Sequence, residues 1–365
     1  MLPIFRAAAF AASSLTAIAA LAACSSSSGT SSVPQALPGS QQQSIASQDS
    51  RPVPRYVVLH TAPFNAPPAG GLPLWSGSFK YGATTYSYTM VGANPATSNA
   101  TTNIPAVIIP VKIVASGKTF DPQHVLPNGN SVVKNTTASP VLSSGIDFKE
   151  GGTDLGNTQY IDAFQRGNFW SKVKTHTNYH TLLTPTVLAE QTYNGGTVGS
   201  PFGFQVAEVD INSFDSFING LISSLHISSG TFPIFLTYDT YLTSGGCCIG
   251  GYHNYNGSNT YSQATYIDHA GAFAQDVSAL SHETGEWYDD PLTNNRVACG
   301  ILEVGDPEEG FSNYGAFPYT LNGFTYNLQD LVWLPYFGAP PATSLHKQLS
   351  FQQNPFHLGI CSQGG

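Results

Sequence analysis

Residues 280–291 read Leu-Ser-His-Glu-Thr-Gly-Glu-Trp-Tyr-Asp-Asp-Pro. A proline disfavours helical geometry at the residue before it, here Asp290, so a helix through this stretch is expected to end at about Tyr288. Asp268 is a residue type that often caps the start of a helix, and we expect the helix to begin there. His282 and Glu286 are four residues apart and therefore share one helix face. The spacing predicts a long helix that presents an imidazole beside a carboxylate.

An imidazole and a carboxylate on one helix face can bind the same metal ion. The zinc-hydrolase motif His-Glu-x-x-His has this spacing, and Glu286 stands here in place of its second histidine. Carboxylate oxygen is a competent zinc ligand. Glu283 follows His282 directly and can act as a general base toward metal-activated water. The motif predicts zinc on His282 and Glu286, with Glu283 as the catalytic base.

A catalytic zinc ion needs a third protein ligand, and the sequence leaves three candidates open. Glu303 and Asp306 follow Glu286 by 17 and 20 residues, and they rank first and second. His253 ranks third as a ligand. If His253 does not bind the metal, its expected catalytic role is to polarise a substrate carbonyl or to hold an oxyanion.

Charge is scarce in this chain and unevenly placed. The 365 residues include 22 acidic and 13 basic side chains, which gives a net charge of −9. Between His176 and Leu345 there are 16 acids, and Arg296 is the one Lys or Arg. Eight of these acids fall within the 27 residues 283–309. A bound cation would offset this local excess. The same charge excludes nucleic acid as a partner, because phosphate binding needs clustered Lys and Arg.

Two other groups of polar residues are possible sites. Oxygen-bearing side chains just after the helix offer calcium as an alternative metal, since calcium takes many oxygen ligands. They are Asp289, Asp290, Asn294 and Asn295. His176 and His180 are also four residues apart, but no acidic cluster accompanies them. We interpret these two histidines as structural.

The N-terminus predicts export and a lipid anchor. Residues 1–23 have the charge and apolar stretch of a signal peptide, and Leu21-Ala22-Ala23-Cys24 resembles a bacterial lipobox that is cleaved before Cys24. The resemblance implies a diacylglyceryl thioether on Cys24, with palmitate among its acyl chains. Ser25 resembles the outer-membrane sorting pattern of Gram-negative lipoproteins. Residues 24–52 are poor in large apolar side chains and predict a disordered tether. We therefore expect a cell-envelope protein that is lipid-anchored, in the outer membrane.

Four further cysteines predict two disulfides, as an even number does in an exported chain. They are Cys247, Cys248, Cys299 and Cys361. Three connectivities are open. We favour pairing each of the adjacent cysteines with Cys299 or Cys361, because a ring between neighbours is strained. A four-cysteine zinc site is the rival interpretation, but the usual Cys-x-x-Cys pairs are absent from the sequence.

The rest of the chain predicts an α+β fold with two lobes. Residues 53–155 are expected to form a β-rich lobe, because their β-branched and aromatic runs are broken by Gly, Pro and Asn. Its expected strands are 56–59, 84–90 and 104–114. Residues 156–365 are expected to form the metal-binding lobe. Its expected elements are a short helix within 157–170, an amphipathic helix at 214–225 capped by Asn212 or Ser213, strands at 231–238 and 260–267, and a loop at 244–253.

Three motifs in the second half carry a family resemblance. They are Cys-Cys-x-Gly-Gly-Tyr-His at 247–253, Ser-His-Glu-x-x-Glu-x-x-Asp-Asp-Pro at 281–291 and Leu-Glu-Val-Gly-Asp-Pro at 302–307. Together they resemble secreted bacterial lipoproteins that are zincin-like metallopeptidases, and more distantly the exordium (phosphate-induced) proteins of plants. The resemblance implies a zincin-like lobe around the long active-site helix. It implies no particular substrate.

The sequence supports two functional hypotheses. The first is a zinc-dependent hydrolase of the cell envelope, a peptidase that acts on a peptide or protein. The second is a non-catalytic surface or binding lipoprotein that holds zinc or calcium as a structural ion.

Overall fold

A computed structural model describes residues 55–58, 71–352 and 359–362. The predicted signal peptide, Cys24 and the tether up to residue 52 lie outside the described residues, as does Leu59. Among the described residues, no helix is long and apolar enough to cross a membrane.

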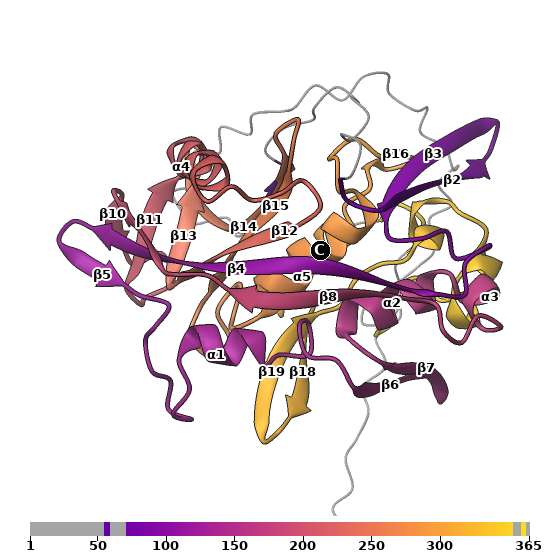
Figure 1. Ribbon diagram of the computed structural model, residues 1–365, viewed down its shortest axis with the longest axis horizontal. Coiled ribbons are helices and arrows are strands. Elements are labelled where there is room, and N and C mark those ends of the chain that lie inside the picture. The colour runs from indigo at the N-terminus through magenta and orange to yellow at the C-terminus, as the bar shows by residue number, and fades with distance from the viewer. Residues whose placement is uncertain (1–54, 59–70, 353–358, 363–365) are drawn as a thin grey trace, which may run out of the picture. The chain divides into compact units, whose positions relative to one another are not determined.

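One sheet of 11 strands forms the framework of the protein (Figure 1). Its main strand order is β10-β11-β13-β14-β15-β12-β4-β5, while β1 pairs with β14 and both β8 and β9 pair with β4. The strands are β1 (Arg55–Val58), β4 (Thr101–Ala115), β5 (Lys118–Phe120), β8 (His180–Val187), β9 (Gln191–Asn194), β10 (Thr197–Gly199), β11 (Val206–Asp210), β12 (Phe232–Tyr238), β13 (Thr240–Thr243), β14 (Cys247–Tyr255) and β15 (Thr260–Tyr266).

The predicted fold class, a β-rich N-terminal lobe beside a zincin-like C-terminal lobe, is wrong. β4 belongs to the first half of the sequence, yet it lies between β12 and β8 from the second half (Figure 1). Ile108 of β4 is in parallel register with Ile234 on one side and Val187 on the other. The physical reason is the long apolar, β-branched run of β4, which favours a buried strand with a partner on each edge. The second half therefore contributes most of the sheet and not a helical lobe.

The described residues contain five α-helices, none of them long. They are α1 (Val132–Thr137), α2 (Tyr160–Asn168), α3 (Trp170–Val173), α4 (Ile211–Ser224) and α5 (Ser278–Asp289). Four two-stranded hairpins surround the main sheet: β2 (Leu74–Tyr81) with β3 (Thr84–Val91), β6 (Ile146–Glu150) with β7 (Thr153–Thr158), β16 (Arg296–Val297) with β17 (Gly300–Ile301), and β18 (Ala316–Leu321) with β19 (Phe324–Gln329).

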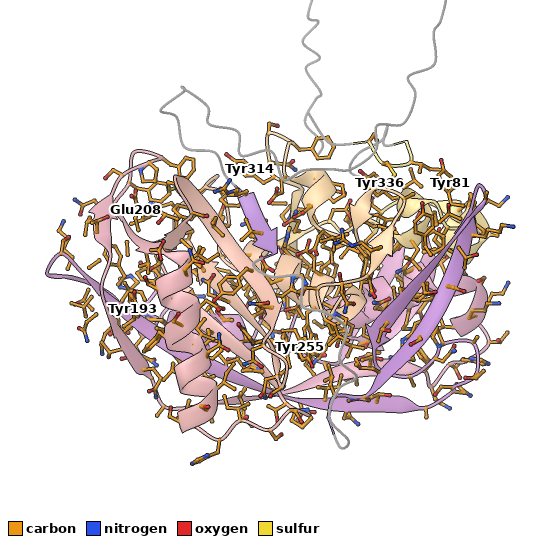
Figure 2. All side chains as sticks on the ribbon, turned by 90° about the horizontal axis from the view of Figure 1, so that it is seen from above. Tyr81, Tyr193, Glu208, Tyr255, Tyr314 and Tyr336 are labelled. Carbon is orange, nitrogen blue, oxygen red and sulfur yellow. A yellow bond between two sulfur atoms is a disulfide. The ribbon has the colours of Figure 1, made fainter. Side chains whose placement is uncertain are left out.

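The sheet buries both of its faces. Alternate residues of β12 point to opposite sides, so Phe235 joins the apolar cluster under α4, while Ile234 and Leu236 join the larger cluster that includes α5. Tyr193 of β9 packs on α4 with its ring 5.3 Å from that of Phe214, and Figure 2 shows it beside that helix. Helix α5, which carries His282 and Glu286, is therefore enclosed on the face of the sheet opposite α4.

Most predicted elements of the second half are confirmed, with shifted ends. Predicted strands 231–238 and 260–267 are β12 and β15, and predicted strands 84–90 and 104–114 of the first half are β3 and β4. The short helix predicted within 157–170 is α2, and α3 begins at the last residue of that stretch. The cap of α4 is Asp210, whose carboxylate accepts the Ser213 N–H at 2.9 Å, and not Asn212 or Ser213.

The long helix is shorter than predicted. α5 begins at Ser278, ten residues after the predicted cap. Asp268 does not cap it, because its own N–H donates to Asp239 Oδ1 at 2.9 Å and the chain then turns through positive φ angles at Ala274 and Asp276. The predicted loop at 244–253 is largely strand β14.

The described residues contain two disulfides, but the favoured pairing was wrong. Cys299 pairs with Cys361, with Cα atoms 5.2 Å apart, and Cys247 pairs with its neighbour Cys248. The peptide bond between the neighbours is cis. Cys248 is buried in β14 of the main sheet, whereas Cys299 lies between the short strands β16 and β17.

Candidate metal centre

Helix α5 is buried along its whole length, which is unusual for a helix that carries three acidic residues. It packs against β14, β15 and β19. Its approach to β14 depends on Gly251, since a Cβ there would lie 2.8 Å from both Cγ and Oε1 of Glu283. A larger residue at 251 would push the strand off the helix. The glycine thus lets a β-strand and an acidic helix share a site.

His282 has one ring nitrogen fixed and one directed at carboxylates. Its Nδ1 lies 2.9 Å from Oε1 of Gln329, whose Nε2 donates to the carbonyl of Gly305 at 3.0 Å. The Gln329 oxygen is therefore an acceptor, and His282 Nδ1–H is the donor. His282 Nε2 then faces Oε1 of Glu286 at 3.0 Å and Oδ1 of Asp306 at 3.5 Å. These three residues form a first group of ligand atoms, all within 4.8 Å of one another.

Two further contacts hold the His282 ring in place. Tyr56 of β1 stacks on it with ring centroids 3.7 Å apart. Gly305 also contacts the ring, so closely that a Cβ at this position would lie 2.3 Å from His282 Nδ1. Gly305 N–H also donates to Glu286 Oε1 at 3.1 Å. The segment that carries Asp306 is therefore bound directly to both helix ligands.

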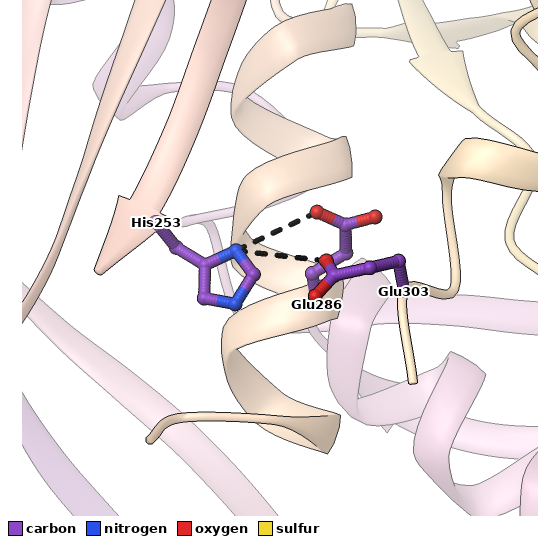
Figure 3. Close-up of side chains that lie close together, drawn as sticks. All are labelled: His253, Glu286 and Glu303. Carbon is purple, nitrogen blue, oxygen red and sulfur yellow. Dashed lines mark ion pairs between the residues drawn. The ribbon is translucent and has the colours of Figure 1, made fainter. Parts of the chain in front are cut away.

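His253 lies on β14 and faces the same helix from the sheet side. Its Nε2 lies 3.2 Å from the carbonyl of Asp290. Its Nδ1 faces three carboxylates, at 3.4 Å from Glu283, 3.5 Å from Glu286 and 4.0 Å from Glu303. Figure 3 shows the imidazole directed at the Glu286 and Glu303 carboxylates. His253, Glu286 and Glu303 form a second group of ligand atoms within 4.8 Å of one another.

The structure brings all six predicted site residues into one cluster, with a different grouping from the one ranked first. His282 and Glu286 are joined by Asp306, whereas Glu303 lies with His253. Five of the six side chains are buried; the Asp306 side chain is 38% exposed. Solvent therefore reaches the cluster beside Asp306.

The close charges shift the pKa values of the cluster. Burial alone raises the pKa of Glu286, but the imidazoles of His282 and His253 outweigh it and lower this pKa below the ordinary range. Burial, with the nearby Glu286 carboxylate, raises the pKa of Glu303 well above its ordinary value. Burial also raises the pKa of Glu283 to about 7, although His253 and His282 oppose it. Burial lowers the pKa of His253, but Glu283 and Glu286 more than offset this and raise it to about 10.

The donor set fits a metal ion. Among the described residues, His282 Nε2, Glu283 Oε1 and Glu303 Oε1 are buried without a hydrogen-bond partner. Within the same part of the chain, no Lys or Arg forms an ion pair with the cluster. Imidazole nitrogen and carboxylate oxygen are ordinary ligands of zinc and other divalent ions. A buried set of this kind needs a positive charge, and the cluster is thus a potential metal-binding site.

Three supporting residues were not predicted from the sequence. Gln329 fixes the His282 ring, Tyr56 stacks on it, and the Asp290 carbonyl fixes His253. The first two come from β19 and β1, far from α5 in the sequence, and a single glutamine or tyrosine carries no local signal. The Asp-Asp-Pro ending of the helix was the one available clue, because it placed Asp290 next to the motif.

The residues of the alternative calcium site already form hydrogen bonds within the protein. The Asp290 carboxylate accepts N–H groups of Asn294 and Asn295 at 2.9 and 3.1 Å. The Asn295 side chain bonds to the backbone of Thr89 at 2.9 and 2.8 Å, and Asp289 accepts a hydrogen bond from Gln165. These contacts bind the turn after α5 to β3 and leave few oxygens for a cation.

His176 and His180 lie apart from the cluster in contacts typical of structural residues. His176 Nδ1 lies 2.9 Å from the Pro95 carbonyl. His180 Nδ1 lies 2.7 Å from the Asp162 carboxylate.

Comparisons with known proteins add no family. No family model matches the chain, and no curated protein matches it. One solved structure, metalloproteinase-II from Bacteroides fragilis, is 11% identical over 61% of this chain and 87% of that chain, with a TM-score of 0.18. A likeness this low carries no argument. The resemblance to zincin-like lipoproteins and exordium proteins stays a prediction.

The raised pKa values predict how pH affects the metal-free protein. The unfolded pKa values of Glu and Asp are about 4.3 and about 3.9. In the folded state, burial raises those of Glu283 to about 7 and of Asp290 to about 6. The folded state therefore binds more protons, and the free energy of unfolding falls as pH rises from about 4 to about 7. His253 acts in the same direction, since its contribution is lost as pH rises from its unfolded pKa of about 6.5 through about 10.

Thermal unfolding of the chelated protein should thus show a lower Tm at about pH 8 than at about pH 5.5. Zinc should raise Tm more at the higher pH, because its ligands must be deprotonated to bind. A Tm of the chelated protein that is higher at the alkaline pH would contradict the assigned burial of these acids.

Proposed function

We propose that this protein is a zinc-dependent hydrolase and that its substrates are peptides or proteins. The observation that supports this most directly is the group His282, Glu286 and Asp306 beside a buried fourth group, Glu283. One imidazole and two carboxylates make a mixed nitrogen and oxygen ligand set, as catalytic zinc sites use. The partly exposed Asp306 gives this site an open side.

His282, Glu286 and Asp306 would hold the zinc ion, which would act as a Lewis acid toward a substrate carbonyl. Glu283 supplies the base. Its Oε2 lies 3.4 Å from His253 Nδ1, while its Oε1 has no hydrogen-bond partner among the described residues and can accept a proton. Its pKa, raised by burial to about 7, is suited to proton transfer near neutral pH. Gln329 and Gly305 keep His282 and Glu286 oriented.

One observation favours a second candidate function, a non-catalytic lipoprotein with a structural metal. His253, His282 and Glu283 have no exposed surface. Structural zinc sites are closed in this way, whereas catalytic sites keep a position open to substrate. The two functions differ in whether the metal-loaded protein turns over a substrate.

A peptidase assay separates these two functions. The zinc-loaded chain is incubated with casein and with a mixed peptide library, and new N-termini are identified by mass spectrometry. The proposal predicts cleavage that stops after chelation and returns when zinc is restored. Absence of cleavage by a chain shown to hold zinc would contradict the hydrolase and support the structural-metal candidate.

We further propose that the protein is a lipoprotein of the bacterial outer membrane, anchored through lipid on Cys24. The lipobox-like Leu21-Ala22-Ala23-Cys24 and the following Ser25 support this. Expressed in a Gram-negative host, the protein is expected in the detergent phase and the outer-membrane fraction. Cys24→Ser is expected to move it to the aqueous phase. An unchanged partition would contradict the anchor.

A further inference from the structure

We infer that the cluster binds two divalent cations, which share the carboxylate of Glu286. The first is the ion of the proposed function, at His282, Glu286 and Asp306. The second is held by His253, Glu286 and Glu303, the group drawn in Figure 3. The inference rests on the proposed function only in that both require a metal at His282.

Both histidines are fixed in the tautomer that a metal ligand needs. His282 donates its Nδ1–H to Gln329, so the lone pair of Nε2 faces carboxylates. In His253 the roles of the two ring nitrogens are exchanged. A carbonyl oxygen can only accept, so His253 Nε2–H donates to Asp290 O, and the lone pair of Nδ1 faces carboxylates. Anchoring the far nitrogen of a ligating imidazole on such an acceptor is the usual arrangement at metal sites.

Without a metal, a proton on each imidazole offsets the facing carboxylates, and a divalent cation bound in place of the proton offsets more of their charge. His253 Nδ1 has carboxylate oxygens of Glu283, Glu286 and Glu303 within 4.0 Å. His282 Nε2 is 3.0 Å from Glu286 Oε1 and still makes no hydrogen bond. Each imidazole thus faces its own set of carboxylates, where a cation can replace the proton.

The two carboxylate oxygens of Glu286 face different histidines. Oε1 faces His282 at 3.0 Å, and Oε2 faces His253 at 3.5 Å. A single ion at His282 would leave His253 Nδ1 with only its 3.4 Å contact to Glu283, and Glu303 Oε1 without a partner among the described residues. A carboxylate placed between two nitrogen ligands in this way is suited to bridge two ions, as in two-metal hydrolases.

The charge of the cluster also matches two ions. An imidazole that binds a metal is neutral, and four carboxylates face the two imidazoles: those of Glu283, Glu286, Glu303 and Asp306. Two divalent cations balance four negative charges, whereas one leaves half of them uncompensated. Among the described residues, no Lys or Arg forms an ion pair with any of the four. Buried carboxylates without a cation are strongly disfavoured.

Metal content tests the inference without an activity assay. The full chain is dialysed against buffered zinc, and bound zinc per chain is measured by mass spectrometry. The expected value is two for the native sequence and one for each of His253→Ala and His282→Ala. His124→Ala removes an exposed imidazole on the connection after β5 and is the matched control, with two ions expected.

Manganese provides a spectroscopic check. With Mn²⁺ as the probe, two ions that share a carboxylate should give a spin-coupled electron paramagnetic resonance signal. Either histidine variant should convert it to the signal of an isolated ion. If a variant fails to fold, as circular dichroism would show, the zinc content and the Mn²⁺ coupling of the native chain decide alone.

The outcomes separate this inference from the proposed function. One zinc per chain and an uncoupled Mn²⁺ signal would overturn the shared site, while cleavage of peptides by that chain would leave the hydrolase standing. Two zinc ions without hydrolysis would support the shared site and overturn the hydrolase. Zinc lost in the His124 variant as well would show binding at exposed histidines and would also overturn the inference.

Discussion

Replacement of Glu283 by Gln is expected to slow peptide hydrolysis by at least about 100-fold, the lower end of what general-base catalysis contributes. The amide has the shape of the carboxylate but cannot accept a proton. The substitution leaves His282, Glu286 and Asp306 in place, so zinc at that site should be retained. The measurement is kcat/KM on a cleaved peptide, with zinc content determined on the same sample.

Glu208→Gln is the matched control, because Glu208 lies on β11, away from α5. Its activity and zinc content should equal those of the native chain. Full activity of the Glu283 variant would exclude Glu283 as the base. Loss of zinc together with activity would show that Glu283 acts chiefly as a ligand.

Replacement of Glu286 by Gln is expected to remove most bound zinc. Glu286 faces both imidazoles and accepts the Gly305 N–H, so it connects every part of the cluster. Without its charge, both ligand groups lose their shared member. A buried ion pair that loses one partner is destabilised by about 3–5 kcal/mol. The expected readouts are near-zero zinc after dialysis and a Tm that no longer responds to zinc.

Asp306→Asn gives a graded comparison for the Glu286 variant. Asp306 is partly exposed and belongs to one ligand group only, so its loss should weaken zinc binding less. A Glu286 variant that keeps native zinc content and the native rise in Tm would contradict its place at the centre of the cluster.

The local part of the site could be predicted from the sequence. Residues four apart on a helix lie on one face, and His282 and Glu286 are indeed 3.0 Å apart. The concentration of acids in residues 283–309 was a second signal, because so few acids occur elsewhere. Asp306 and Glu303 follow in the chain and return to the helix through the hydrogen bond of Gly305.

The remainder depended on pairing between distant segments. β4 joins β8 and β12 through register that no local pattern encodes. The sequence predicted that His253 lies near the site. It predicted a loop there and not a strand, because the surrounding residues are rich in glycine and cysteine. The start of α5 was misplaced since Asp268 bonds to Asp239, and the cysteine pairing followed from how β14 is placed. Tertiary contacts outweighed local preference in each case.

Anomalous diffraction at the zinc absorption edge tests the metal centre most directly. Crystals of the zinc-loaded chain should show an anomalous peak within ligand distance of His282 Nε2 and Glu286, on the side of Asp306. A second peak is expected beside His253 Nδ1 and Glu303. Zinc bound elsewhere, or His282 and Glu286 surrounding only a proton or water at full zinc loading, would contradict the central claim that α5 is a metal-binding helix.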